Sequence, residues 1–288
     1  MSFTTANFHG KSMFAIASGC VVLGAAAALL LPGYAPKKPV SITPALKIDT
    51  SAHTVPIATP TPVDAIPDWA RSQVIRKVPV GSERKVIALT FDDGPWPGST
   101  KRILKILADN HIRATFFMIG SVLSDYPRLG RAVRDAGMAI GNHSWDHPIR
   151  PQDPVGEITD TDAEIHKILG ITPTLFRPPY GALDNGLATQ AKQERDAVIL
   201  WSADPRDWSR PGANAIASVI LRQASSGGIC LMHDGGGDRS ETVAALPRII
   251  ATLRQRGYEF VTVPELLAMR TASTHVEHTA KSRNITHS

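Results

Sequence analysis

The sequence predicts an α/β fold in which a parallel sheet closes into a barrel-like arrangement. From about residue 74 onward, short apolar stretches rich in β-branched and aromatic residues alternate with longer stretches whose apolar residues recur every three or four positions. This alternation is typical of βα units, which build parallel sheets and barrels. About seven such units can be counted, a barrel-like number, and they share no repeat in sequence.

The boundaries of the units follow from turn residues and from changes of period. The expected strands are 74–79, 85–91, 114–119, 138–141, 174–176, 197–201, 228–233 and 259–261. The expected helices begin at about residue 99 or 100 and then occupy 127–136, 157–169, 185–194, 214–225 and 242–256.

Local signals support several of these elements. Ser99 or Thr100 is a suitable N-cap for the first helix, and Gly137 and Gly170 end the second and third. The first two strands flank a Gly-Ser turn at 81–82, so we expect them to pair as an opening hairpin.

The 288-residue chain is 43% hydrophobic and 20% charged, as is ordinary for globular proteins. Its net charge of +5 comes from scattered Lys and Arg residues, and no basic run is interleaved with aromatic residues, which argues against nucleic-acid binding. Cys20 lies in an apolar run and Cys230 in an expected strand, so neither a disulfide framework nor a thiolate metal site is available.

The N-terminal region predicts a membrane anchor or a secretory signal at residues 1–35. Met13 to Leu31 is a run of nineteen residues without a charge, which is long enough to span a bilayer. Pro36 follows the small residues where cleavage would be expected, so we favour an uncleaved anchor and an extracytoplasmic domain, with a secreted form if the segment is cleaved.

Two further segments carry no expected fold. Residues 36–73 are rich in Pro, Ser, Thr and Ala and predict a disordered linker, which leaves 74–270 as the folded domain. Residues 271–288 predict a disordered tail, and the histidines there are treated as solvated residues.

Two adjacent carboxylates, Asp92 and Asp93, end the strand at 85–91 and precede Gly94-Pro95. Taken alone, Asp-Asp-Gly is most simply a solvated turn. Side chains alternate along a strand, so we expect the two carboxylates to leave on opposite sides and to have different roles.

Four later stretches also place polar groups at the ends of apolar runs. In parallel βα barrels these strand ends share one face, where catalytic groups collect. The stretches are Asn142 to His147, Arg177 to Gly181, Asp204 to Trp208 and Leu231 to Asp234.

His143 and His147 are four residues apart, so a helical turn or a tight loop would bring both imidazoles to one side. An isolated pair of this kind can also simply pack or cap. Together with Asp93 it forms a three-ligand set for one divalent cation, and nitrogen-rich ligation favours Zn²⁺, with Co²⁺ or Mn²⁺ as alternatives.

These stretches resemble the five motifs of the polysaccharide deacetylases, the carbohydrate esterase family 4 or NodB homology domain. The resemblance covers roughly residues 74–270 and has all five motifs in order, and it implies a distorted (β/α)7 barrel. The motifs are Thr90 to Pro95, His143 to His147, Arg177 to Tyr180, Asp207-Trp208 and Leu231 to His233.

The resemblance also implies a role for each motif residue. Asp92 is expected to be the general base, Arg177 to position it, and His233 to be the general acid, held and charge-stabilised by Asp207. The expected metal ligands are Asp93, His143 and His147. The expected sugar-pocket residues are Tyr180, Trp208 and Leu231, with the backbone N–H of Tyr180 stabilising an oxyanion.

The implied reaction is hydrolysis of N-acetyl groups on N-acetylglucosamine residues of a polysaccharide. A water activated by the metal and Asp92 attacks the amide carbonyl, and His233 protonates the departing nitrogen. The expected substrate is peptidoglycan, with chitin oligomers or O-acetylated xylan as alternatives. An inactive glycan-binding module is the non-enzyme alternative, but it would be expected to lack at least one role-bearing residue.

Overall fold

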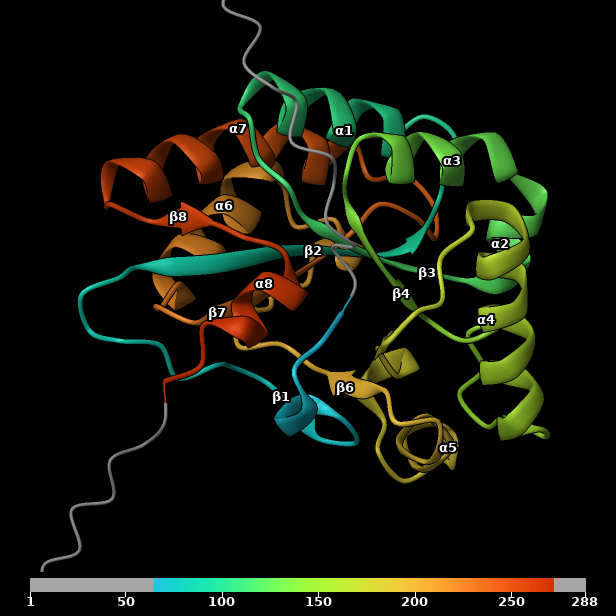
Figure 1. Ribbon diagram of the computed structural model, residues 1–288. Coiled ribbons are helices and arrows are strands. Elements are labelled where there is room, and N and C mark those ends of the chain that lie inside the picture. Colours follow the sequence, from blue (N-terminus) through green and yellow to red (C-terminus); the bar gives the residue numbers. More distant parts are fainter. Residues whose placement is uncertain (1–64, 272–288) are drawn as a thin grey trace, which may run out of the picture. The chain divides into compact units, whose positions relative to one another are not determined.

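The structure, a computed structural model, describes residues 65–271. Parallel strands alternate with helices that lie around the sheet (Figure 1). The strands are β1 (Val74–Ile75), β2 (Val86–Gly94), β3 (Thr115–Met118), β4 (Ala139–Asn142), β5 (Leu175–Phe176), β6 (Ala197–Ile199), β7 (Gly228–His233) and β8 (Glu259–Phe260). The helices are α1 (Thr100–Asp109), α2 (Gly120–Asp125), α3 (Pro127–Asp135), α4 (Pro154–Leu169), α5 (Leu187–Gln193), α6 (Ala213–Gln223), α7 (Ser240–Gln255) and α8 (Val263–Ala268), with 3₁₀ turns at Asp68–Ala70, Pro179–Gly181 and Asp207–Ser209.

The sheet is a distorted barrel. Its strands follow the order β1-β6-β5-β4-β3-β2-β7, with β8 added beside the start of β2, and all these pairs are parallel. The segment after β6 closes the circle against β7, because the N–H of Ser202 donates to the carbonyl of Ile229 and the N–H of Leu231 donates to the carbonyl of Ala203, both at 2.9 Å. The predicted α/β barrel is therefore confirmed.

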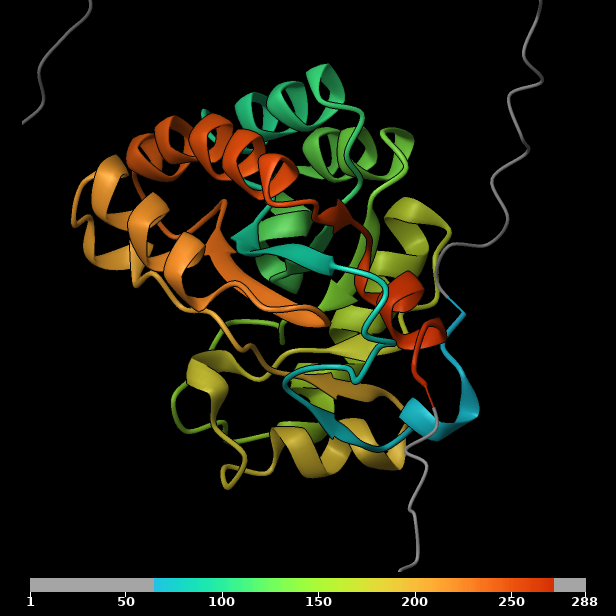
Figure 2. The same cartoon turned by 90° about the vertical axis from the view of Figure 1, so that its left-hand side faces the viewer.

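Alternation along β2 divides its side chains between two environments. Ile87, Leu89 and Phe91 pack in the larger apolar cluster with residues of α1, α6 and α7, whereas Val86 and Ala88 lie in a second cluster. Figure 2 shows α7, α1 and α3 side by side over one side of the sheet. Burying each large apolar side chain stabilises the fold by about 1.5–3 kcal/mol.

The predicted opening hairpin is wrong. The first strand, β1, pairs in parallel with β6, in the register Val74 with Val198 and Ile75 with Ile199. This pairing supplies hydrogen-bond partners to the open edge of β6 and buries Ile75 in the core. A hairpin between β1 and β2 would instead compete with β7 for the same edge of β2.

Ser99, one of the two predicted candidates, is the N-cap residue of α1, but its side chain does not cap the helix. The hydroxyl of Ser99 donates to the backbone carbonyl of Asp234 at 2.5 Å, and the hydroxyl of Thr100 donates to the Asp234 carboxylate, also at 2.5 Å. Both hydroxyls therefore hold the start of α1 against the loop after β7. Helices α2 and α8 were not expected from the sequence.

The folded region extends to the N-terminal side of β1, because Ile66 and Ala70 are buried in the second apolar cluster. The predicted anchor at 1–35, most of the predicted linker at 36–73 and nearly all of the predicted tail at 271–288 lie outside the described residues. Within residues 65–271, none of the helices is long and apolar enough to cross a bilayer.

Candidate active site

The two carboxylates at the end of β2 face the same site. Asp92 Oδ2 lies 3.7 Å and Asp93 Oδ1 lies 3.4 Å from His143 Nε2. The prediction that they leave the strand on opposite sides is wrong, because the register with β3 shifts between Asp92 and Gly94 and Asp93 has a φ of 72°. This left-handed residue interrupts the strict alternation of a strand.

The two histidines lie in a tight loop that follows β4, as one of the two sequence alternatives expected. Ser144 and His147 both have left-handed backbones, with φ of 68° and 55°. His143 Nδ1 lies 2.7 Å from the carbonyl of Arg177, a contact in which Nδ1–H donates and Nε2 is left to face Asp93. His147 Nε2 lies 3.5 Å from the same Asp93 oxygen.

Asp93, His143 and His147 fit one divalent cation. Each offers a ligand atom, and these atoms all lie within 4.8 Å of one another. Asp93 Oδ1 is buried without a hydrogen-bond partner among residues 65–271, although buried carboxylate oxygens are normally satisfied. A cation between the two imidazoles would satisfy it, so the residues fit the metal that the sequence predicts.

The charge states of these residues also suit metal binding. Burial opposes ionisation of Asp93, but the neighbouring imidazoles, above all His143, outweigh it and hold the pKa of this carboxyl well below its usual range. Burial, together with the charge of His143, lowers the pKa of His147 to about 4, against the opposing effect of Asp93. At neutral pH, Asp93 is an anion and His147 keeps a free lone pair, as ligands must.

Arg177 fixes the position of Asp92. Its side chain is fully buried, and Nη1 donates to Asp92 Oδ1 and to Thr90 Oγ1, both at 2.7 Å. Nε donates to the carbonyl of Ile199 at 3.1 Å, and the guanidinium lies 4.1 Å from the ring centroid of Phe117. Asp92 is therefore held by a cation that cannot turn toward solvent.

Partly buried His233 and fully buried Asp207 form a second pair. His233 Nδ1 lies 2.7 Å from Asp207 Oδ1, while the backbone N–H of His233 and the hydroxyl of Thr242 donate to Oδ2 at 2.9 and 2.7 Å. Burial on its own would lower the pKa of His233, but the hydrogen bond and charge of Asp207, helped by Asp93 and Asp92, raise it to about 9. His233 is therefore protonated at neutral pH.

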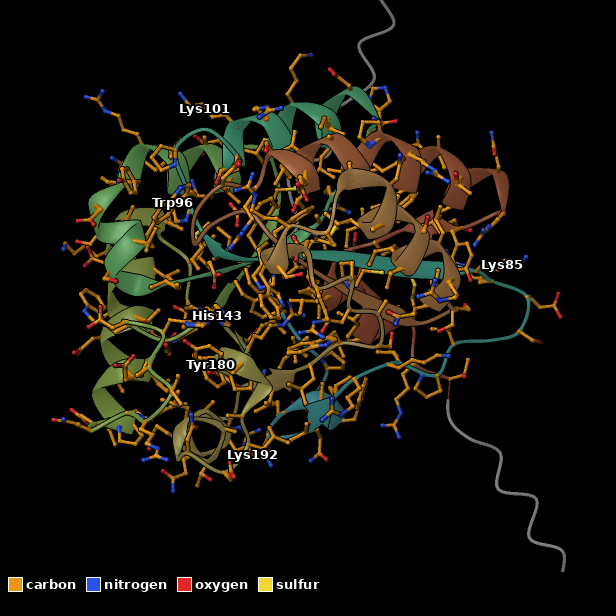
Figure 3. The ribbon with its side chains drawn as sticks, turned by 180° about the vertical axis from the view of Figure 1, so that it is seen from behind. Lys85, Trp96, Lys101, His143, Tyr180 and Lys192 are labelled. Carbon is orange, nitrogen blue, oxygen red and sulfur yellow. The ribbon has the colours of Figure 1, made fainter. Side chains whose placement is uncertain are left out.

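One cavity of about 510 Å³ is lined by Asp92, Asp93, His143, His147 and His233 and by the predicted pocket residues Tyr180, Trp208 and Leu231, whereas Arg177 and Asp207 are not part of its lining. His143 and Tyr180 lie close together, and Lys85, just before β2, lies at the far end of the sheet (Figure 3). The N–H of Tyr180 makes no hydrogen bond within the described residues, so it is available to a ligand. Its predicted oxyanion role stays a prediction.

Three further residues line the cavity and were not among the predicted site residues: Pro178, Trp201 and Asp204. Trp201 lies two residues after the end of β6. The rule that functional groups collect just after strand ends therefore marks its position in the sequence.

Comparison with known proteins agrees with this geometry. The sequence profile of the family described as polysaccharide deacetylase matches residues 80–195. A peptidoglycan-N-acetylglucosamine deacetylase of Bacillus cereus is 42% identical over 194 residues, which cover 65% of this chain and 91% of that protein. A chitooligosaccharide deacetylase of Sinorhizobium fredii is 34% identical, over 66% of this chain and 96% of that protein.

The chain belongs to the polysaccharide deacetylase family. It is a hydrolase of the kind that acts on amide bonds, and this family is metal-dependent. The chain spans only 40–41% of the length of longer peptidoglycan deacetylases from Bacillus subtilis and Listeria monocytogenes.

A solved structure shows why the site geometry matters beyond family membership. A family 4 pseudoenzyme from Bacillus anthracis is 27% identical, with a TM-score of 0.61 over 67% of this chain and 68% of that one. A protein of this fold can therefore be a pseudoenzyme. In this polysaccharide deacetylase, both carboxylates, both loop histidines and His233 are present and converge on one cavity.

Proposed function

We propose that this protein is a zinc-dependent deacetylase that removes N-acetyl groups from N-acetylglucosamine residues of peptidoglycan. The observation that carries the proposal is the arrangement of the cavity. A three-residue metal site shares one cavity with a carboxylate, Asp92, and a protonated imidazole, His233. A base and an acid beside a Lewis-acid site are what hydrolysis of an amide requires.

The contacts of the site support the proposed roles of the metal-site residues and Asp92, and the N–H of Tyr180, free within residues 65–271, supports its proposed role. A divalent cation held by Asp93, His143 and His147 supplies Lewis acidity toward water and the acetyl carbonyl. Asp92, fixed by Arg177, takes the proton of the attacking water. The N–H of Tyr180 donates to the oxyanion that develops on the substrate.

The acid step belongs to His233. An amide nitrogen leaves only after it is protonated, and His233, whose pKa is raised to about 9, holds that proton at neutral pH. Asp207 keeps the imidazole oriented through Nδ1, so that Nε2 is the nitrogen that delivers the proton.

The substrate and the cellular location belong to the same proposal. Relatives named for peptidoglycan and for chitooligosaccharides both support a glycan of N-acetylglucosamine. The apolar run at 13–31 favours a protein anchored in a membrane, with its catalytic domain on the extracytoplasmic side, where peptidoglycan is the available polymer.

The test is to incubate the zinc-loaded full chain with purified peptidoglycan, with chitin oligomers and with acetylated xylan, and to measure acetate and free amine. We expect acetate and amine in equal amounts from peptidoglycan. Faster release from chitin oligomers would identify them, rather than peptidoglycan, as the preferred substrate. Acetate without amine would indicate an esterase. No acetate from any of the three would refute the proposal, and the His143→Ala variant serves as the inactive control.

A further inference from the structure

The loop that carries two of the three metal-site residues is held by a side chain of helix α4. Glu157, in the first turn of α4, accepts hydrogen bonds through Oε2 from the backbone N–H groups of Trp145 and Asp146, at 2.7 and 3.0 Å. These two residues lie between His143 and His147. No other acceptor for either N–H is found in the described part of the chain. One carboxylate oxygen therefore orders the backbone that joins the two imidazoles.

The loop needs such support because its backbone is strained. Ser144 and His147 are left-handed, with φ of 68° and 55°. Non-glycine residues keep this conformation only where the surroundings enforce it. If the loop lost its contacts, it would relax toward ordinary backbone angles, and the separation of the imidazoles of His143 and His147 would change.

Helix α2 holds the carbonyl groups of the same loop. The N–H of Gly120 donates to the carbonyl of Ser144 at 3.0 Å. The N–H and the hydroxyl of Ser121 donate to the carbonyl of Trp145 at 3.0 and 2.8 Å. Helices α2 and α4 lie side by side (Figure 1). The start of α2 thus binds acceptors of the loop and Glu157 binds its donors, so both kinds of backbone group are paired.

Two more N–H groups of the loop are satisfied from within the segment 142–147. Asn142 Oδ1 accepts from the N–H of Ser144 at 2.7 Å, and Ser144 Oγ accepts from the N–H of His147 at 3.1 Å. These acceptors belong to the segment and move with it. Among residues 65–271, Glu157 is the one side chain from outside the segment that accepts from its N–H groups.

Glu157 has no competing task in the described part of the chain. Asp153 is the N-cap of α4, and its Oδ1 accepts from the N–H groups of Val155 and Gly156 at 3.1 and 3.0 Å. Glu157 forms no ion pair within residues 65–271. The next residue, Ile158, is fully buried and fixes this turn of α4 in the core. The carboxylate is therefore directed at the loop from a firmly packed helix.

We infer that Glu157 is a positioning residue for the metal site. By holding the N–H groups of Trp145 and Asp146, it sets the separation of the imidazoles of His143 and His147, and with it the affinity of the site for a divalent cation. The inference rests on the metal site of the proposed function but not on its reaction, because metal binding is measured without turnover.

The zinc affinity of the full chain, measured in competition with a chromophoric chelator, tests this role. We expect Glu157→Leu to weaken the affinity about 10–100-fold and to change the visible absorption spectrum of the cobalt-substituted protein. Asp160→Leu also replaces a carboxylate by leucine, at an exposed position of the same helix, and is the matched control. Its zinc affinity and cobalt spectrum should be those of wild type.

Two conservative variants separate the hydrogen bonds from the charge of Glu157. Glu157→Gln removes the charge but keeps an oxygen at the same reach, so its zinc affinity should stay within about threefold of wild type. Glu157→Asp keeps the charge but is one methylene shorter and cannot reach both N–H groups, so it should be weakened as Glu157→Leu is. An aspartate is favourable in the first turn of a helix, so this variant also carries the test if Glu157→Leu does not fold.

Amide hydrogen exchange in the metal-free protein reports the two hydrogen bonds themselves. The amides of Trp145 and Asp146 should exchange faster in Glu157→Leu and Glu157→Asp than in wild type, because local opening becomes easier. In Glu157→Gln they should exchange as in wild type. Unchanged exchange in all three variants would show that Glu157 does not order the loop.

Two further results would overturn the role. One is a Glu157→Leu protein that melts at a lower temperature but keeps wild-type zinc affinity and cobalt spectrum, because Glu157 would then support the fold alone. The other is a Glu157→Gln protein as impaired as Glu157→Leu, because the hydrogen bonds would then not be the cause. A wild-type chain that binds zinc but releases no acetate would refute the proposed function, and the zinc affinities would still decide the role of Glu157.

Discussion

Replacing Arg177 by Met tests how the buried cation supports Asp92. The two side chains are 0% and 3% exposed and 2.7 Å apart, so Arg177→Met leaves the Asp92 carboxylate buried without its partner. Breaking a buried pair from one side costs about 3–5 kcal/mol of unfolding free energy. For a domain of this size, that corresponds to a fall in Tm of roughly 6–20 °C.

The same substitution should separate activity from metal binding. The contact between His143 and residue 177 is made by the backbone carbonyl, which Met retains, so we expect the zinc content to stay near one per chain. Turnover should fall at least a hundredfold, since Asp92 loses the donor that orients it. Arg177→Lys keeps a charge but cannot donate to Asp92 and Ile199 together. We therefore expect its turnover to lie between that of the wild type and that of Arg177→Met.

A double-mutant cycle tests whether Arg177 compensates the buried charge of Asp92. Asp92→Asn removes the buried charge, so the double variant Arg177→Met/Asp92→Asn should be less destabilised than the sum of the single variants by about 0.5–3 kcal/mol. Denaturant unfolding at constant pH measures all four proteins. An additive cycle, or an Arg177→Met protein within about 1 kcal/mol of wild type, would refute the idea that Arg177 compensates a buried carboxylate.

Three further predictions address the site and its location. His147→Ala should lose zinc and activity together, whereas Asp92→Asn should keep zinc and lose most turnover; equal zinc loss in both would mean that the two carboxylates have exchanged roles. Asp207→Asn should move the alkaline limb of the pH–rate profile to lower pH. The hydrogen bond and charge of Asp207 raise the pKa of His233 to about 9, so their loss lowers this pKa and His233 loses its proton at a lower pH. An unmoved limb, with zinc content unchanged, would show that Asp207 is only structural. The full chain should sediment with membranes and be released when residues 1–35 are deleted; recovery of full-length protein in the soluble cytoplasmic fraction would contradict the anchor.

The sequence predicts the fold well where the signal is local. The period of apolar residues changes at each strand and helix, so the βα alternation can be read directly, and the polar groups after strand ends mark one face of a barrel. Helix α8 was missed although its signal is present. Thr262 and Glu265 form a capping box, a pattern that marks the start of a helix in the sequence itself.

The missed features depend on contacts between distant parts of the chain. The pairing of β1 with β6 joins residues more than a hundred positions apart, and nothing near Val74 encodes it. The left-handed backbone of Asp93 depends on the loop after β7, where Gly235 leaves so little room that a Cβ would lie 1.9 Å from the Asp93 carbonyl oxygen. Alternation alone therefore placed Asp93 on the wrong side.

His147, in the metal site, and His233, the proposed acid, show how one residue type serves two purposes. Burial, with the charge of His143, lowers the pKa of His147 to about 4, so this imidazole is neutral and able to bind a cation. His233 is partly buried, with 12% of its side chain exposed, and this burial would also lower its pKa, but the Asp207 carboxylate at 2.7 Å reverses the effect and raises the pKa to about 9. Groups whose environments separate their pKa values in this way can be assigned different roles from structure. At neutral pH the cavity thus holds a neutral imidazole, a protonated imidazole and ionised Asp93 together, and exchanging the surroundings of the two histidines would remove both the ligand and the acid.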